Sequence, residues 1–296
     1  MKIKELNKIH NKIIHTEKAF AKINLTLNVF KKDLNGLHNI NSIVAFTDLY
    51  DSIEFYKNKK THLLINNNVD GVISKLDNII IKSDSIFRSL CPGSDYYLYK
   101  LDKYIPIAAG LGGGSADAAA IFRGLCKINN KQMSDIIGSG ISDTIGSDVT
   151  ACLFSKLLLL QGTGEKITTL DNNIQLFALL VNPNKEISTK KVFSMIQSNN
   201  LRTDNDNFNQ LNTDNNLLEF IINGKNDLQD IACSLVPEIN RILLMIQRTD
   251  KCIVSRMSGS GATCFGLYEN LEYLDKAYHH IINTYPDYWC KKVSLF

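Results

Sequence analysis

The sequence predicts an α+β protein with two domains. Its 296 residues are more than one small hydrophobic core usually organises, and 44% of them are hydrophobic, as in ordinary globular proteins. Patterns typical of strands dominate the beginning of the chain, whereas strands and helices mix later, which favours α+β over a doubly wound α/β sheet. Gly162-Thr163-Gly164 suits a junction, so we expect domains at residues 1–163 and 164–296.

The expected elements follow from the spacing of apolar residues. Alternation with period two predicts strands, and a period near 3.6 predicts helices. Residues 1–18 look like a dispensable polar extension, residues 198–216 look like a loop, and Asp77-Asn78 is typical of a helix cap. The predicted strands are 19–29, 42–48, 51–56, 96–101, 152–160, 176–182 and part of 252–268, and the predicted helices are 79–90, 115–127, one from about 134, 189–196, 226–247 and 270–283.

Composition and charge exclude several classes of function. The formal net charge of +3 comes with no concentrated basic face, so we expect no nucleic-acid partner. The seven cysteines form no CxxC pair and no Cys/His cluster, which argues against structural zinc and a disulfide framework and fits a reducing cytosol. The N-terminal residues lack a signal-type apolar core, and the apolar run around Leu157–Leu160 is too short to span a bilayer. We therefore expect a cytoplasmic protein without a membrane partner, as a monomer or homodimer.

The stretch from Pro106 to Ala120, Pro-Ile-Ala-Ala-Gly-Leu-Gly-Gly-Gly-Ser-Ala-Asp-Ala-Ala-Ala, is the most informative part of the chain. Its glycines permit positive φ angles and close approach of a ligand, and the helix that follows points free N–H groups and its positive dipole end at the loop. Such a loop is an anion site, and phosphate is the anion that it most often binds. No lysine follows the glycines, as a Walker loop needs, and Ser115 stands where the dinucleotide fingerprint needs its last glycine. A tight structural turn is the alternative.

This glycine loop resembles the second motif of the GHMP kinase superfamily. Three further stretches agree in order with that superfamily: Ala21-Lys22-Ile23-Asn24-Leu25 is similar to its first motif, Gly146-Ser147-Asp148-Val149 to its Gly-Ala/Ser-Asp-Val segment, and Met257-Ser258-Gly259-Ser260-Gly261 to the start of its third motif. Four ordered motifs within residues 19–268 are far more specific than one motif alone. The resemblance implies an N-terminal domain of the ribosomal protein S5 domain 2-like type, a ferredoxin-like C-terminal domain, and an active site between them.

The resemblance also implies an ATP-dependent kinase that uses Mg²⁺. The nucleotide phosphates would lie against the loop, and the implied ATP-binding residues are Pro106, Ala108, Ala109, Gly110, Leu111, Gly112, Gly113, Gly114, Ser115 and Ala116. The Ser115 hydroxyl would contact a phosphate oxygen or Mg²⁺, or would serve as an ordinary helix N-cap, and one serine is able to do both. Phosphoryl transfer depends on such positioning and on charge neutralisation more than on covalent help.

Lys22 and Asp148 are the implied catalytic pair. In the superfamily the matching aspartate takes the proton of the attacking hydroxyl, and a nearby ammonium favours the ionised carboxylate. From the residues alone, Asp148 is a turn residue that enters an apolar strand, and Lys22 is a solvent-facing strand residue. Asn24 lies two positions beyond Lys22 on the same face, where its amide would hold the substrate hydroxyl.

The remaining implied residues bind the substrate. The triple-glycine form of the motif resembles the branch of the superfamily that phosphorylates the tertiary 2-hydroxyl of a cytidine diphosphate-linked methylerythritol. His38 and Phe193 would grip the cytosine ring, and Gly259, Ser260 and Gly261 would bring N–H groups close to the substrate diphosphate or the transferred phosphate. A core role for Phe193 and a simple hairpin at residues 259–261 are the alternatives.

Departures from the family pattern and rival functions also bear on the assignment. Leu37 stands where tyrosine is usual, which weakens stacking on the base, and Thr150 and Lys190 stand where proline is frequent. A relative that acts on homoserine, mevalonate or a sugar would typically carry Gly-Leu-Gly-Ser-Ser-Ala, unlike Gly112-Gly113-Gly114-Ser115. A catalytically silent binding protein on this fold would lack the base or the loop, and both are present.

Overall fold

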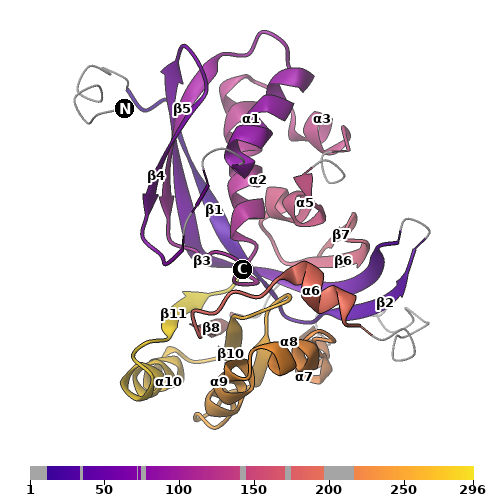
Figure 1. Cartoon of the computed structure of the whole chain (residues 1–296), viewed down its shortest axis with the longest axis vertical. Coiled ribbons are helices and arrows are strands. Elements are labelled where there is room, and N and C mark those ends of the chain that lie inside the picture. Colours follow the sequence, from indigo (N-terminus) through magenta and orange to yellow (C-terminus); the bar gives the residue numbers. More distant parts are fainter. Residues whose placement is uncertain are drawn as a thin grey trace.

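Two β-sheets organise the chain, and helices cover one face of each (Figure 1). The computed structural model describes residues 12–33, 36–71, 73–74, 78–140, 145–170, 175–196 and 217–296, with Ser147 as backbone only. This mixture of separate sheets and helices is the predicted α+β class. None of the described helices is long and apolar enough to cross a membrane.

The first sheet has the strand order β4-β5-β3-β6-β7, and β1 and β2 also pair with β3. Its strands are β1 (His15–Asn24), β2 (Asn28–Lys32), β3 (His38–Asn58), β4 (His62–Asn67), β5 (Tyr96–Lys103), β6 (Leu158–Gly162) and β7 (Lys166–Thr169). One face carries α1 (Ile79–Leu90), α2 (Gly113–Ile128), α3 (Met133–Ile137) and α5 (Ser147–Phe154). The helix α2 starts at the glycine loop, so its packing on this sheet fixes where the loop lies.

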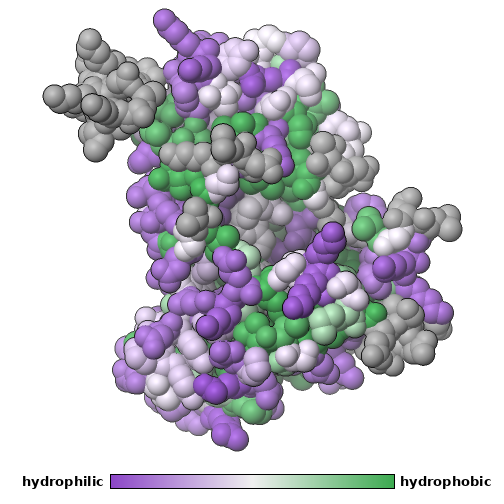
Figure 2. Space-filling model, viewed as in Figure 1, coloured by the Kyte–Doolittle hydropathy of each residue, from purple (hydrophilic) through white to green (hydrophobic). Residues whose placement is uncertain are grey.

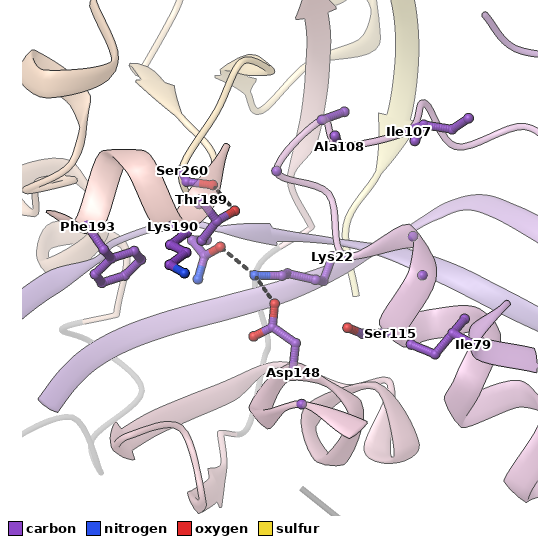
Figure 3. Close-up of a pocket in the computed structure, with 18 of the residues that line it drawn as sticks. Lys22, Ile79, Ile107, Ala108, Ser115, Asp148, Thr189, Lys190, Phe193 and Ser260 are labelled. Carbon is purple, nitrogen blue, oxygen red and sulfur yellow. Dashed lines mark hydrogen bonds and ion pairs between the residues drawn. The ribbon is translucent and has the colours of Figure 1, made fainter. Parts of the chain in front are cut away.

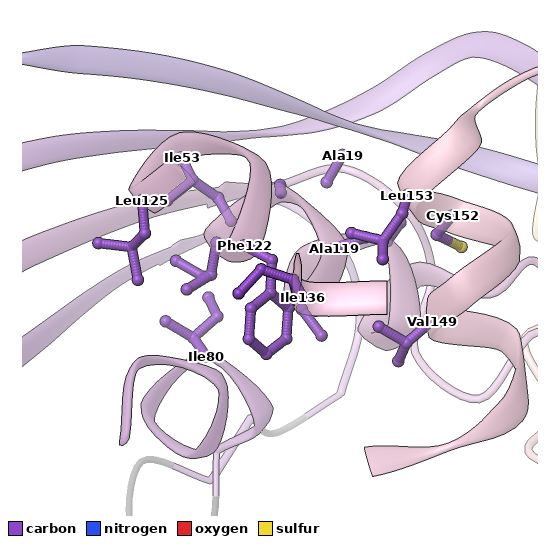
Figure 4. Packing of buried hydrophobic residues seen from close by; sticks show 14 of the residues in the cluster. Ala19, Ile53, Ile80, Ala119, Phe122, Leu125, Ile136, Val149, Cys152 and Leu153 are labelled. Atoms are coloured by element: carbon purple, nitrogen blue, oxygen red, sulfur yellow. The ribbon is translucent and has the colours of Figure 1, made fainter. Parts of the chain in front are cut away.

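Small residues let α2 approach the sheet closely (Figure 4). Residues 118–120 are alanines with no exposed surface, and Phe122 fills the space between α2 and its neighbours. At Gly124, a Cβ atom would lie 2.3 Å from Cζ of Phe55 on β3, so only glycine fits there. This apolar cluster holds the beginning of α2 rigidly against β1 and β3.

The second sheet has the order β11-β8-β10-β9. Its strands are β8 (Phe177–Asn182), β9 (Val254–Met257), β10 (Cys264–Tyr268) and β11 (Trp289–Ser294), and the helices in this part of the chain are α6 (Thr189–Ser194), α7 (Leu217–Asn223), α8 (Gln229–Leu235), α9 (Glu238–Gln247) and α10 (Leu271–Thr284). An apolar cluster that includes Ile43 and Ala45 of β3 and Ala178 and Leu180 of β8 packs the two sheets together. The other face of the second sheet packs against α8, α9 and α10.

Several predicted elements agree with the structure. Asn78 caps α1, since its Oδ1 accepts from the Ile80 amide at 2.9 Å, while Asp77 lies outside the described residues. The predicted loop at 198–216 also lies outside them. The first sheet ends with β7 and the second begins with β8, and the division into domains at residue 163 stays a prediction.

Other predicted elements differ from the structure. Residues 152–154 belong to α5 rather than to a strand, and only β6 at 158–162 is extended. The predicted strands 42–48 and 51–56 are one continuous strand, β3. The strand β1 begins at His15, so residues 15–18 are not a dispensable extension, and the predicted strand 19–29 is interrupted between Asn24 and Asn28. The predicted helix 226–247 is divided at Pro237 into α8 and α9, because proline has no N–H group to continue a helix.

Candidate active site

One large cleft collects most of the predicted site residues. Its volume is about 1180 Å³, and the glycine loop, β1, α5, α6 and the β9–β10 loop line it (Figure 3). On the face seen in Figure 2, apolar side chains gather around the middle of the molecule, and hydrophilic ones dominate its two ends. The predicted site residues that line the cleft are Lys22, Asn24, His38, Pro106, Ala108, Ala109, Gly110, Gly112, Gly113, Gly114, Ser115, Asp148, Phe193, Gly259 and Ser260.

Three predicted site residues lie behind the cleft wall instead. Leu111 and Ala116 are each 1% exposed and pack into the apolar clusters. A Cβ atom on Gly261 would lie 2.7 Å from Sδ of Met257, so this glycine gives the β9–β10 loop its shape. These residues therefore contact a ligand only through backbone atoms, and their other role is to support the residues that line the cleft.

The glycine loop leaves the first turn of α2 open to an anion. The N-cap of α2 is Gly112 in the left-handed conformation, which has no side chain to cap the first amides, and among the described residues no other side chain accepts a hydrogen bond from them. Ser115 is therefore inside the first turn and is not the N-cap, which removes one of its three predicted roles. A Cβ atom on Gly114 would meet nothing within 4 Å, so the loop faces open space there. Unsatisfied amides at a helix N-terminus form an anion site.

The loop is held in place by the other two motifs. The Ser258 hydroxyl donates to the Gly110 carbonyl at 2.9 Å and accepts from the backbone amide of Asn24 at 3.2 Å. The Lys22 amide donates to the Leu111 carbonyl at 3.0 Å. A Cβ atom on Gly110 would lie 2.4 Å from the Ser258 carbonyl oxygen, so the two loops touch without room for a side chain. The first, second and third motifs thus form one connected structure.

Lys22 and Asp148 meet in the cleft, as Figure 3 shows. Lys22 Nζ lies 3.2 Å from Asp148 Oδ2 and donates to Asn24 Oδ1 at 2.7 Å. The Lys22 side chain is 7% exposed, whereas the Asp148 side chain is 40% exposed and open to a ligand. Asp148 lies in the first turn of α5, not in a turn before a strand as predicted, and that position favours a carboxylate because of the helix dipole. The side-chain amide nitrogen of Asn24, Nδ2, donates to the Ser42 hydroxyl at 2.8 Å, and this hydrogen bond fixes the orientation of the Asn24 side chain.

A buried group of charges beneath the loop was missed by the sequence analysis. Lys103 Nζ lies 2.5 Å from Asp51 Oδ2 and 2.7 Å from Asp117 Oδ2, and Lys103 and Asp117 line the cleft. Burial raises the pKa of Asp117 to about 7, because the apolar surroundings disfavour its charge more than Lys103 favours it. Burial alone would lower the pKa of Lys103, but the two carboxylates raise it above its usual value. The available signal was Asp117, which is the one charged residue between Gly110 and Phe122.

His38 and Phe193 form the other end of the cleft. Their ring centroids are 5.8 Å apart, and the rings are tilted by 38°. His38 Nδ1 lies 2.8 Å from the Phe30 carbonyl oxygen, which only accepts, so Nδ1 carries a proton, and in the tautomer with this single proton Nε2 is an acceptor. Leu37 is 57% exposed at the cleft. Thr189 and Ser260 join α6 to the β9–β10 loop through a hydrogen bond of 2.7 Å between their hydroxyls.

The donor set bears on whether a metal ion fits. The described residues contain no group of three or more His, Cys, Asp or Glu side chains that could hold one. Magnesium ions in phosphoryl-transfer sites use one or two protein groups together with substrate phosphates, rather than a cage made by the protein. The Ser115 hydroxyl beside the open helix N-terminus fits that kind of binding.

Known proteins resemble this chain over nearly its whole length. The profiles "GHMP kinases N terminal domain" and "GHMP kinases C terminal" match residues 78–156 and 196–287. A protein of Anaplasma marginale (strain Florida) named 4-diphosphocytidyl-2-C-methyl-D-erythritol kinase is 38% identical over 285 residues, which cover 94% of this chain and 96% of that protein. A protein of Caldanaerobacter subterraneus subsp. tengcongensis with the same name is 36% identical over 279 residues, covering 91% and 93%.

Solved structures share the fold. The crystal structure of a 4-(cytidine 5'-diphospho)-2C-methyl-D-erythritol kinase superposes with a TM-score of 0.77 at 22% identity and covers 94% of this chain and 99% of that one. The homoserine kinase of Cytophaga hutchinsonii gives a TM-score of 0.71 at 15% identity, with 96% of both chains covered. These similarities confirm the predicted two-domain architecture. The chain belongs to the GHMP kinases and, within them, to the family of 4-diphosphocytidyl-2-C-methyl-D-erythritol kinases.

Proposed function

We propose that this protein transfers the γ-phosphate of ATP to the 2-hydroxyl of 4-diphosphocytidyl-2-C-methyl-D-erythritol, in the methylerythritol phosphate route to isoprenoid precursors. The observation that carries the proposal is the position of Asp148. Its partly exposed carboxylate lies beside Lys22, in the same cleft as the uncapped N-terminus of α2. A kinase needs this combination of an anion site and a carboxylate that faces the acceptor hydroxyl.

The nucleotide phosphates lie against the glycine loop in this proposal. The amides of the first turn of α2 donate to the phosphate oxygens, and the helix dipole adds to their attraction. The open space at Gly114 gives those oxygens room to approach the backbone. The Ser115 hydroxyl would hold Mg²⁺ together with the phosphates, and the ion would neutralise charge on them during transfer.

Asp148 acts as the general base on the acceptor. Its carboxylate takes the proton of the 2-hydroxyl while the hydroxyl oxygen forms a bond to the γ-phosphorus and the bond to ADP breaks. Lys22, whose Nζ lies 3.2 Å from Asp148 Oδ2, orients this carboxylate and offsets the negative charge that gathers at the acceptor. Asn24 Oδ1 holds the Lys22 ammonium in place at 2.7 Å.

The cytosine end of the substrate binds at His38 and Phe193. His38 Nε2 accepts from the exocyclic amino group of cytosine, which is a donor, and the Phe193 ring packs on the base. The hydrogen bond from His38 Nδ1 to the Phe30 carbonyl keeps the ring in the tautomer that this contact needs. Leu37 adds apolar contact at the cleft without an aromatic face.

The variant Asp148→Asn tests the proposal, because it removes the base and changes the shape of the side chain little. Turnover with 4-diphosphocytidyl-2-C-methyl-D-erythritol should fall by at least about a hundredfold, the scale of a general base, while ATP affinity stays within about twofold. Asp275→Asn is the matched control, since Asp275 forms an ion pair with Lys292 at 2.6 Å on the surface. Homoserine and mevalonate serve as alternative acceptors. Full turnover in the Asp148 variant, or faster turnover of a non-cytidyl alcohol, would contradict the assignment.

A further inference from the structure

Lys32 and Lys190 are cationic side chains in the cleft that have no ion-pair partner among the described residues. The other charged side chains that line the cleft have partners: Lys22 with Asp148, Lys103 with Asp51 and Asp117, and Glu165 with the amide and hydroxyl of Thr163. The ammonium groups of Lys22 and Lys103 are thus engaged by carboxylates of the protein. The ammonium groups of Lys32 and Lys190 therefore stay available to an anionic ligand.

Both lysines lie beside the aromatic pair. Lys32 ends β2 and is the cross-strand partner of His38 on β3. Lys190 precedes Phe193 by three residues on α6, so the two side chains are neighbours on one side of the helix. Figure 3 shows Lys190 between Phe193 and Lys22, with its chain directed into the cleft. These two available cations thus lie between the cytosine end and the catalytic end of the site.

We propose that Lys190, with Lys32 as a second cation, binds the diphosphate that joins the cytidine to the alcohol of the substrate. This inference rests on the function proposed above. With the base at His38 and Phe193 and the acceptor hydroxyl at Asp148, the diphosphate must span the region between them, where Lys190 stands. The hydrogen bond between the Thr189 and Ser260 hydroxyls fixes α6, and with it Lys190, beside the β9–β10 loop.

Binding of cytidine 5′-diphosphate and of cytidine measures the contribution of the diphosphate directly. The variant Lys190→Met removes the charge and keeps an unbranched chain, and Lys191→Met is its control, because Lys191 is exposed on the same helix and is not a cleft residue. Calorimetric dissociation constants for both ligands give the ratio of their affinities in each protein. Loss of one charge-assisted hydrogen bond predicts about tenfold weaker binding of the diphosphate in the Lys190 variant, with cytidine changed by less than about twofold.

Further variants sharpen the result. Lys190→Arg should retain the preference for the diphosphate, and Lys32→Met should reduce it by a few-fold, because a second cation contributes through longer-range attraction. In turnover, Lys190→Met should raise KM for the cytidyl substrate and leave KM for ATP unchanged. Equal losses for cytidine and its diphosphate, or the same affinity ratio as in Lys191→Met, would overturn the inference. If the unaltered protein neither bound cytidine 5′-diphosphate nor phosphorylated the substrate, the proposed function itself would fail.

Discussion

A substitution at Gly112 tests two features of the glycine loop: its left-handed backbone conformation and its close contact with the Lys22 side chain. A Cβ atom on Gly112 would lie 2.7 Å from Cγ and 3.0 Å from Cε of Lys22. Because carbon atoms pack at about 3.5–4.0 Å, Lys22 would have to withdraw by about 1 Å in Gly112→Ala. A catalytic group displaced by that amount costs roughly a hundredfold in rate. The left-handed φ of +66° adds a stability cost of roughly 1–2 kcal/mol, since L-residues disfavour that conformation.

Gly112→Ala should therefore lose about two orders of magnitude in kcat while thermal unfolding shifts by only a few degrees, as expected for that change in free energy. Gly114→Ala is the informative comparison, because its added methyl group meets no protein atom within 4 Å and the residue is helical. It should keep or slightly raise stability and should instead raise KM for ATP, because the methyl group enters the space of the phosphates. Steady-state kinetics and calorimetry of both variants test this. Unchanged kcat in a folded Gly112→Ala protein would refute the argument that Lys22 must lie where it does.

Two further predictions concern stability. Because the pKa of Asp117 is raised from 3.8 to about 7, the folded protein holds this proton more tightly than the unfolded chain, and stability falls as pH rises from about 4 through about 7. Asp117→Asn should remove that part of the pH dependence, and parallel curves for both proteins between pH 4 and 8 would contradict it. Gly124→Ala should lower the free energy of unfolding by about 1–3 kcal/mol, because its Cβ atom would lie 2.3 Å from Phe55 Cζ. Urea titration measures the loss, and an unaltered midpoint would exclude this close contact.

The parts of the site that the sequence predicted are those whose chemistry is local. The glycines at 110 and 112 have positive φ, and the sequence marks such positions because other residues adopt them at a cost. The shared face of Lys22 and Asn24 followed from the two-residue period of a strand, and their hydrogen bond of 2.7 Å agrees. In both cases the residue type and its spacing carry the whole signal.

The errors arose where a short apolar run fits either period. Residues 149–154 are apolar but for Thr150, and a run of that length does not distinguish a buried strand from a buried helix. The helix α5 ends at Ser155 in the left-handed conformation, without the glycine that usually marks such an end. The charges at Asp51, Lys103 and Asp117 meet through contacts between residues 14 and 52 positions apart, which no local pattern reveals.

The second sheet shapes the nucleotide loop as much as the first sheet does. Gly110 lies against the carbonyl of Ser258, at a distance that excludes a Cβ atom, and the Ser258 hydroxyl joins the Gly110 carbonyl to the Asn24 amide. The Thr263 amide, on the other side of the β9–β10 loop, donates to the Ala109 carbonyl at 3.2 Å. Each of these contacts joins residues about 150 or more positions apart, so the loop reaches this conformation only when both sheets have packed. The third motif is thus a part of the anion site even where it touches no ligand: a Cβ atom on Gly110 would also lie 2.9 Å from the carbonyl oxygen of Gly261, which is buried behind the cleft wall.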